Sequence, residues 1–205
     1  MSKTVLRFIP VIQLIGIGWM IRLYIGTTLF IALIPLAALI HLWRDKQPRT
    51  TKRVLEVFLL YFLVVGYGFG GLWGFVGHFF FGDMIAQDIG WATGSQFQIE
   101  LAFYHLGFGV VGILAWWIRD NLWTALALGK AIFLYGAAYV HIRDIILFDN
   151  WSPSNAGFEV LYLGDLILPT VILALLAAYK WHSYTGPSED AQPLPSPAHV
   201  QLQPS

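Results

Sequence analysis

Residues 97–141 decide the fold, and they divide into three consecutive pieces: FQIELAFYHLGFGVVGILAWWI, RDN and LWTALALGKAIFLYGAAYVH. The two outer pieces are apolar, and each is close to the ~20 residues that a helix needs to cross a bilayer. The middle piece, Arg119–Asn121, leaves room only for a tight turn. We therefore predict two membrane-spanning helices, Phe97–Ile118 and Leu122–His141, joined as an antiparallel hairpin.

The composition of the 205-residue chain is that of a membrane protein. Hydrophobic residues make up 57% of it and charged residues 12%, whereas soluble domains carry about 25% charged residues. Because too little polar surface remains to face water, we expect the lipid bilayer to surround the chain. The formal net charge of zero argues against nucleic acid as a partner. The absence of cysteine excludes thiolate zinc sites and cysteine-bound iron–sulfur clusters.

The same length criterion predicts three further spans, Leu23–Trp43, Val54–Phe79 and Phe158–Trp181. The predicted fold class is all-α, a polytopic transmembrane helical bundle of about five spans over residues 23–182. Residues 1–22 hold an apolar run that is short for a crossing of its own, so we predict an interfacial or re-entrant lead-in there. Residues 183–205 contain five of the ten prolines among polar residues, which predicts a disordered tail.

The positions of Lys and Arg predict the orientation of the bundle. Loop 44–53 carries five basic residues against one acid, Asp45, and basic loops stay in the cytoplasm. Alternation then puts loops 80–96 and 143–157 outside and the C-terminal tail in the cytoplasm. We expect a multi-pass protein of the cell membrane, of the prokaryotic inner-membrane type.

Small residues mark faces where helices can approach closely. Gly66, Gly70 and Gly74 follow one another at four-residue spacing in the second span. In the third span, Gly109 and Gly112 share a face with His105. Helix packing is the more frequent meaning of such stripes, and a cavity or cofactor groove is the alternative.

Ionisable residues inside spans cost about 2.5–3.5 kcal/mol at the bilayer centre, so each is a functional candidate. By the predicted topology, six of them converge on the outer side of the bundle: His78, Glu100, His105, His141, Asp144 and Asp165. Imidazoles with carboxylates are ligands that a transition metal accepts, and they are equally the parts of a proton relay.

Lys130 is the charge that lies closest to the middle of a span. It forms one helical stripe with Leu134, Ala137, His141 and Asp144. Three interpretations of Lys130 are open: its side chain snorkels toward the interface, it pairs with Asp165 or Glu100 to neutralise a buried charge, or it belongs to a functional site. No di-iron motif, phosphate loop or nucleophile elbow accompanies these residues.

Two stretches resemble a known family. They are WATGSQFQIE at 91–100, running on to Leu106–Gly109, and His141 followed by Asn155–Gly157 and Asp165–Pro169. Together they resemble an uncharacterised family of small bacterial and archaeal multi-pass membrane proteins, a domain of unknown function, over roughly residues 54–181. The resemblance implies a helical membrane bundle with polar residues around the outer loops, and it carries no activity with it.

Three functions remain open on these grounds. The first is a non-enzymatic membrane module, an accessory subunit that joins other membrane subunits or itself through glycine-rich and aromatic faces. The second is a metal- or proton-handling protein that uses the outer His and carboxylate residues. The third is a small transporter with an intramembrane pair, Lys130 and Asp165. The sequence leaves open whether the protein is an enzyme.

Overall fold

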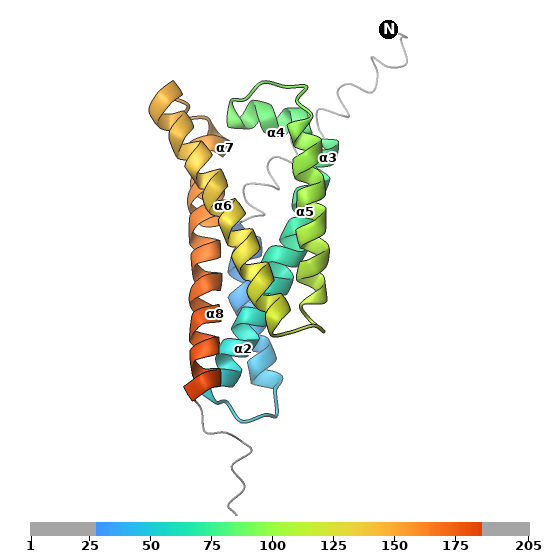
Figure 1. Cartoon of the computed structure of the whole chain (residues 1–205), viewed down its shortest axis with the longest axis vertical. Helices are drawn as coiled ribbons and strands as arrows, with labels where there is room; N and C mark the ends of the chain where they lie inside the picture. The colour runs from blue at the N-terminus through green and yellow to red at the C-terminus, as the bar shows by residue number, and fades with distance from the viewer. Residues whose placement is uncertain (1–27, 186–205) are drawn as a thin grey trace, which may run out of the picture.

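The computed structural model describes residues 28–185. The predicted lead-in, residues 1–22, and residues 186–205 of the predicted tail lie outside the described residues. Within residues 28–185 the chain is all helical, without strands, and its long helices form an elongated bundle (Figure 1). The predicted all-α bundle is confirmed.

The described elements follow in chain order. They are a helix at Thr28–Arg44, α2 (Thr51–Tyr61), the π-helix η1 (Phe62–Phe69), α3 (Gly70–Phe80), α4 (Gly82–Ile89), α5 (Phe97–Leu114), α6 (Asn121–Phe148), α7 (Pro153–Ala156), the π-helix η2 (Phe158–Ile167) and α8 (Leu168–Thr185). Four helical stretches are long and apolar enough to cross a bilayer, namely Thr51–Ile89, Phe97–Leu114, Asn121–Phe148 and Pro153–Tyr184. These lengths and compositions suggest a membrane-embedded protein.

Element boundaries differ from the predicted ones in three places. Helix α6 continues past His141 to Phe148, where Asp149 takes a left-handed conformation (φ 53°) and ends it. Helix α5 stops at Leu114, so that the two tryptophans that follow belong to the turn. The predicted outer loop 80–96 contains α4, which buries Ala86 and Ile89 against the bundle.

Close packing of α5 against α3 and η1 depends on glycine. A Cβ on Gly112 would lie 2.5 Å from the Cα of Gly68, and one on Gly109 would lie 2.8 Å from the backbone nitrogen of Leu72. Real Cβ atoms do not approach backbone atoms so closely, hence only glycine allows the two helices to touch along this line. Gly109 and Gly112 of the predicted third-span stripe thus serve helix packing, but their partners are Gly68 and Gly71, whereas Gly66 and Gly70 of the predicted second-span stripe face the side chains of Ile34 and Phe30.

Helix α6 packs elsewhere, against α8, η2 and α7. At its start the fully buried Trp123 donates from Nε1 to the carbonyl of Ala115 at 2.8 Å, which closes the α5–α6 turn. From this turn the two helices diverge toward the end of the bundle that carries α4 and α7 (Figure 1). The predicted hairpin is therefore tight only at its base.

The opposite end of the bundle is held by ion pairs. Arg53 binds Asp45 at 2.7 Å and Glu56 at 3.0 Å, and Arg119 of the α5–α6 connection also binds Glu56. Thr50 caps α2 by accepting a hydrogen bond from the backbone of Arg53. This end gathers loop 45–50, the α5–α6 turn and the end of α8 (Figure 1).

Two segments of the bundle, η1 and η2, are π-helical, and residues of both line the smaller interior cavity described below. Pro169 has no N–H to donate to the carbonyl of Asp165 four residues earlier, and the wide turns of η2 end just before it, at Ile167. Segment η1 contains the first two glycines of the second span, Gly66 and Gly68, and the other four follow in α3. Wide helical turns of this kind occur frequently at functional sites.

Candidate functional site

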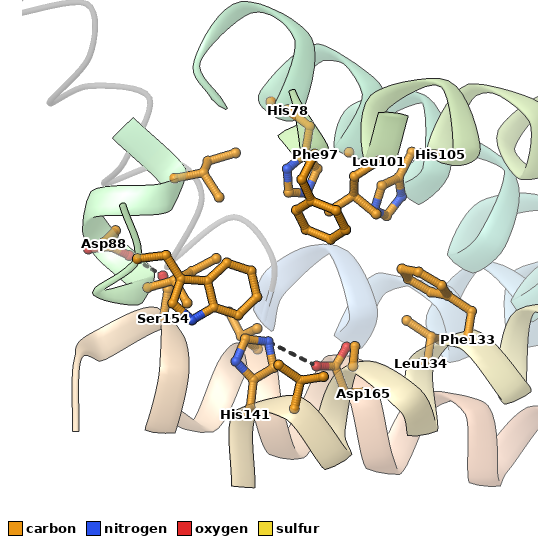
Figure 2. A pocket seen from close by; sticks show the side chains of 18 of the residues that line it. His78, Asp88, Phe97, Leu101, His105, Phe133, Leu134, His141, Ser154 and Asp165 are labelled. Atoms are coloured by element: carbon orange, nitrogen blue, oxygen red, sulfur yellow. Dashed lines mark hydrogen bonds and ion pairs between the residues drawn. The ribbon is translucent and has the colours of Figure 1, made fainter. Parts of the chain in front are cut away.

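A cavity of about 470 Å³ lies between the diverging helices. Its walls come from α3 and α5 on one side and from α6 and η2 on the other, with α4 and α7 at one end (Figure 2). The lining residues include the aromatic side chains Trp73, Trp91, Phe97 and Phe133, and the ionisable side chains His78, Asp88, His105, His141, Glu159 and Asp165. An apolar wall that carries a few convergent polar groups is the usual form of a small-molecule site.

A second cavity of about 380 Å³ adjoins the first and includes Lys130 among its lining residues. The two cavities share six lining residues: Trp73, His105, Leu134, Glu159, Val160 and Asp165. The polar side chains therefore belong to one connected region of the bundle interior.

Asn155 fixes where His141 carries its hydrogen. The fully buried amide donates from Nδ2 to two backbone carbonyls, that of His141 at 3.2 Å and that of Asn150 at 2.7 Å. It consequently turns Oδ1, which can only accept, toward His141 Nδ1 at 2.8 Å. Nδ1 must then carry the hydrogen, so the neutral ring presents the lone pair of Nε2 on its other side.

That other side of His141 faces a carboxylate. Nε2 lies 3.7 Å from Asp165 Oδ2, which is too far for a direct hydrogen bond (Figure 2). Asp165 is 7% exposed, and its Oδ2 has no hydrogen-bond partner among the described residues. Two acceptors thus face each other, and only a hydrogen on one of them or a donor between them can join them.

Trp91 holds the outer face of His141. The two rings stack with their centroids 5.8 Å apart and their planes at 12°. The indole Nε1 donates to Asp144 Oδ2 at 2.7 Å, and Arg143 lies 3.8 Å from the other oxygen of that carboxylate. Asp144 therefore serves to position Trp91 and does not line the cavity.

On the opposite wall, His78 of α3 and His105 of α5 stack at 5.1 Å between centroids (Figure 2). His78 Nδ1 shares a hydrogen bond with Gln98 Oε1 at 2.7 Å. Gly74 makes room for the second ring, because a Cβ there would lie 2.6 Å from His105 Nδ1. The glycine stripe thus shapes the site as well as the helix packing.

Lys130 is 4% exposed and lies beside His105. Its Nζ is 3.4 Å from His105 Nδ1, and it lies over the rings of Tyr104, Phe133 and Phe108 at 4.7, 5.4 and 5.7 Å from their centroids. Aromatic faces stabilise a cation by about 0.5–2 kcal/mol each, which offsets part of its desolvation.

Of the six predicted outer candidates, the cavity brings together His78, His105, His141 and Asp165. Glu100 is exposed and does not line the cavity. It precedes His105 by five residues, which at 100° per residue sets the two side chains about 140° apart on the helix. The stripe predicted on α6 is confirmed by burial, since Lys130, His141 and Asp144 all lie in the interior.

The predicted partner of Lys130 is not in direct contact with it. No ion pair among residues 28–185 joins Lys130 to a carboxylate, although Asp165 lines the same smaller cavity. In the same part of the chain, no three His, Asp or Glu side chains are grouped so that they could hold a metal ion. A transition-metal cofactor gains no support from the geometry and stays a prediction.

Sequence reasoning missed several residues that organise the site: Gln98, Asn155, Trp91, and the pair of Asp88 and Ser154, whose hydroxyl donates to the Asp88 carboxylate (Figure 2). Three of them stand in the two stretches that carry the family resemblance. This overlap with the family resemblance was the one sequence signal that could have identified them, because a search for ionisable residues does not select a neutral amide or an indole.

An apolar helical bundle with ionisable side chains around an interior cavity defines the class, a helical protein with four candidate membrane spans. The model of a family of unknown function (DUF6790) matches residues 25–185, and the chain belongs to this family. The resemblance to an uncharacterised domain is confirmed, while its bacterial and archaeal occurrence stays a prediction. No curated protein and no solved structure matches the chain.

Proposed function

We propose that the protein binds a small amphiphilic molecule in its interior cavity and carries it across or within the membrane. The observation that carries this proposal is a cavity of about 470 Å³ that is lined by two carboxylates, Asp165 and Glu159, each with a buried oxygen that has no hydrogen-bond partner among the described residues. A polar network that served packing alone would be closed, because buried polar groups left unpaired cost about 1–3 kcal/mol each.

The cavity also favours binding over the accessory-subunit hypothesis. A subunit that only packs needs glycine faces and apolar surface, and it needs no cavity lined by ionisable residues from α3, α4, α5, α6 and η2. The transporter hypothesis fits such a cavity best, because intramembrane carboxylates and amines mark substrate pathways.

We place the end with loop 44–53 in the cytoplasm and the α4–α7 end, beside which the cavity lies, outside. The basic residues of that loop support this orientation. Substrate would then enter the cavity from the outer side and approach Lys130 in the deeper of the two cavities.

A cavity-filling variant tests the proposal. Ala137 lines the cavity on α6, and Ala137→Phe would occupy part of its volume, whereas Ala125→Phe changes an exposed position of the same helix. A ligand at about 100 times its Kd stabilises a protein by about 2.7 kcal/mol, which raises the melting temperature by roughly 5–10 °C for a chain of this size.

The measurement is thermal unfolding of detergent-purified protein against a panel of small aliphatic and aromatic alcohols, amines and acids. We expect at least one chemical class to stabilise the wild type and Ala125→Phe but not Ala137→Phe. If no class stabilises the wild type, or if the filled variant responds equally, the protein does not bind small molecules in this cavity.

A further inference from the structure

The charge of the larger cavity selects the sign of its ligand. Three carboxylates line it, those of Asp88, Glu159 and Asp165, and none of the described lining residues is Lys or Arg. Even with Lys130 of the adjoining cavity, acids outnumber permanent bases by three to one. Excess negative charge in a low-dielectric interior favours a cation at that place.

The gap between His141 and Asp165 selects the kind of cation. The ring offers the lone pair of Nε2, because Asn155 holds the hydrogen on Nδ1, and the carboxylate offers the unpartnered Oδ2 at 3.7 Å. A hydroxyl has one hydrogen and can donate to only one of these acceptors. A protonated amine has several N–H donors on one nitrogen and can donate to both.

The dimensions of the gap suit this group after a small adjustment. Tetrahedral N–H bonds with heavy-atom distances of about 2.8 Å span two acceptors that are roughly 4.6 Å apart. The observed 3.7 Å would therefore have to widen by about 1 Å, and Asp165 Oδ2, which has no hydrogen-bond partner among the described residues, is the atom that we expect to move. The walls around the gap include Trp91 and Phe97, aromatic rings against which a cation and an apolar body both pack favourably.

We propose that the ligand is a protonated amine on an apolar or aromatic body, and that its ammonium group lies between His141 Nε2 and Asp165 Oδ2. This assignment rests on the proposed function and names its substrate class. In the empty cavity a single hydrogen between the two acceptors takes the same place. Binding of R–NH3+ therefore displaces that proton to the solvent, while the amine keeps its own hydrogens and no covalent bond changes.

Other titratable groups line the two cavities around this gap and come from every neighbouring element. They are His78 of α3, Asp88 of α4, His105 of α5, Lys130 of α6 and Glu159 of η2. Glu159 accepts a hydrogen bond from Thr28 on one oxygen, and its other oxygen, Oε2, is buried without a hydrogen-bond partner in the described part of the chain. Glu159 is thus a second carboxylate that can balance the positive charge of the ligand.

The test uses three probes of one shape: 4-phenylbutylamine, 4-phenylbutan-1-ol and 4-phenylbutanoic acid. Binding to the full-length protein in lipid nanodiscs is measured by titration calorimetry, with empty nanodiscs as the blank for partitioning. Repeating the amine titration in two buffers of different ionisation enthalpy counts the protons released. We expect saturable binding of the amine at least about tenfold tighter than that of the alcohol or the acid, with release of a proton.

Asp165→Asn removes the charge at nearly constant shape and should abolish the preference for the amine. Asp149→Asn is the matched control, since Asp149 is exposed at the same end of the bundle and Asn tolerates its left-handed conformation. Loss of the preference in Asp149→Asn, or its persistence in Asp165→Asn, overturns the assignment.

The comparison of the three probes on the wild type decides the matter even where a variant fails to fold. Equal binding of amine and alcohol, or tightest binding of the acid, overturns the assignment of an amine. If Ala137→Phe still blocks these probes, the cavity remains a binding site and only the ligand class is wrong. If none of the three probes binds the wild type, the assignment of an amine is overturned, and the panel of small molecules then decides the proposed function separately.

Discussion

Replacing Gly112 by Ala should weaken the packing of α5 against η1 in a way that the structure lets us size. The added Cβ would lie 2.5 Å from both the Cα and the nitrogen of Gly68. Ordinary van der Waals contact begins near 3.4 Å. The two backbones must therefore separate by about 1 Å, and overpacking of this kind costs about 1–3 kcal/mol.

Alanine also raises helix propensity by roughly 1 kcal/mol over glycine, which would hide part of that cost. Gly107→Ala supplies the correction, because Gly107 lies on the same helix and a Cβ there meets no atom within 4 Å. The difference between the two alanine variants isolates the clash. We expect Gly107→Ala to exceed Gly112→Ala in the free energy of unfolding by about 1–3 kcal/mol.

The assay is unfolding in mixed detergent micelles by titration with dodecyl sulfate, followed by circular dichroism. Equal stability of the two variants would show that α5 and η1 do not approach each other as closely as the structure places them. A stability difference of the opposite sign would refute the packing argument as a whole.

Two further predictions concern single charges. Lys130→Met keeps the length of the side chain and removes a desolvated charge. The free energy of unfolding should therefore stay equal or rise by up to about 3 kcal/mol in the same dodecyl sulfate titration, whereas the affinity for ligands should change. The Asp45 carboxylate accepts hydrogen bonds from the backbone N–H of Gln47 and from Arg53, which hold its pKa below the ordinary 3.8. Its contribution to stability is present above that pH and is lost as the pH falls through the lowered pKa, so Asp45→Asn should flatten the melting temperature against pH in this range.

Hydropathy and small-residue spacing predicted the bundle because each depends on one segment at a time. Span length follows from bilayer thickness, and the close approach at Gly109 and Gly112 follows from the absent Cβ. The same local reasoning predicted that Lys130 and His141 share one helical stripe, and the structure adds that both are buried. Ends of helices were harder: Arg143 and Asp144 interrupt the apolar run just after His141, where the predicted span ended, yet α6 continues through them to Phe148.

The partners within the site could not be predicted, because they join segments far apart in the chain. Asn155 reaches His141 from another helix, and Trp91 reaches Asp144 across 53 positions. Such contacts depend on the path of the connecting loops, and the periodicity of apolar residues within a helix carries no information about that path. Glu100 shows the converse error, since the predicted topology placed it at the outer side with His105, although it is exposed on another face of α5.

The arrangement of Lys130 and Asp165 is difficult to explain as packing alone. Each is more than nine-tenths buried, and an ion pair between them would have offset much of the desolvation of both. Instead the amine faces His105 and three aromatic rings, and the carboxylate faces the lone pair of His141 with one oxygen unpartnered by hydrogen bonding. The open oxygen of Asp165 therefore suits a cationic guest, while Lys130 lies apart from it beside aromatic rings. The unpartnered oxygen of Asp165 costs stability in the empty protein until a cation or a proton occupies the gap between His141 and Asp165. The cost of burying Lys130 does not depend on that gap. The stability of Lys130→Met and the ligand preference of Asp165→Asn should therefore change independently.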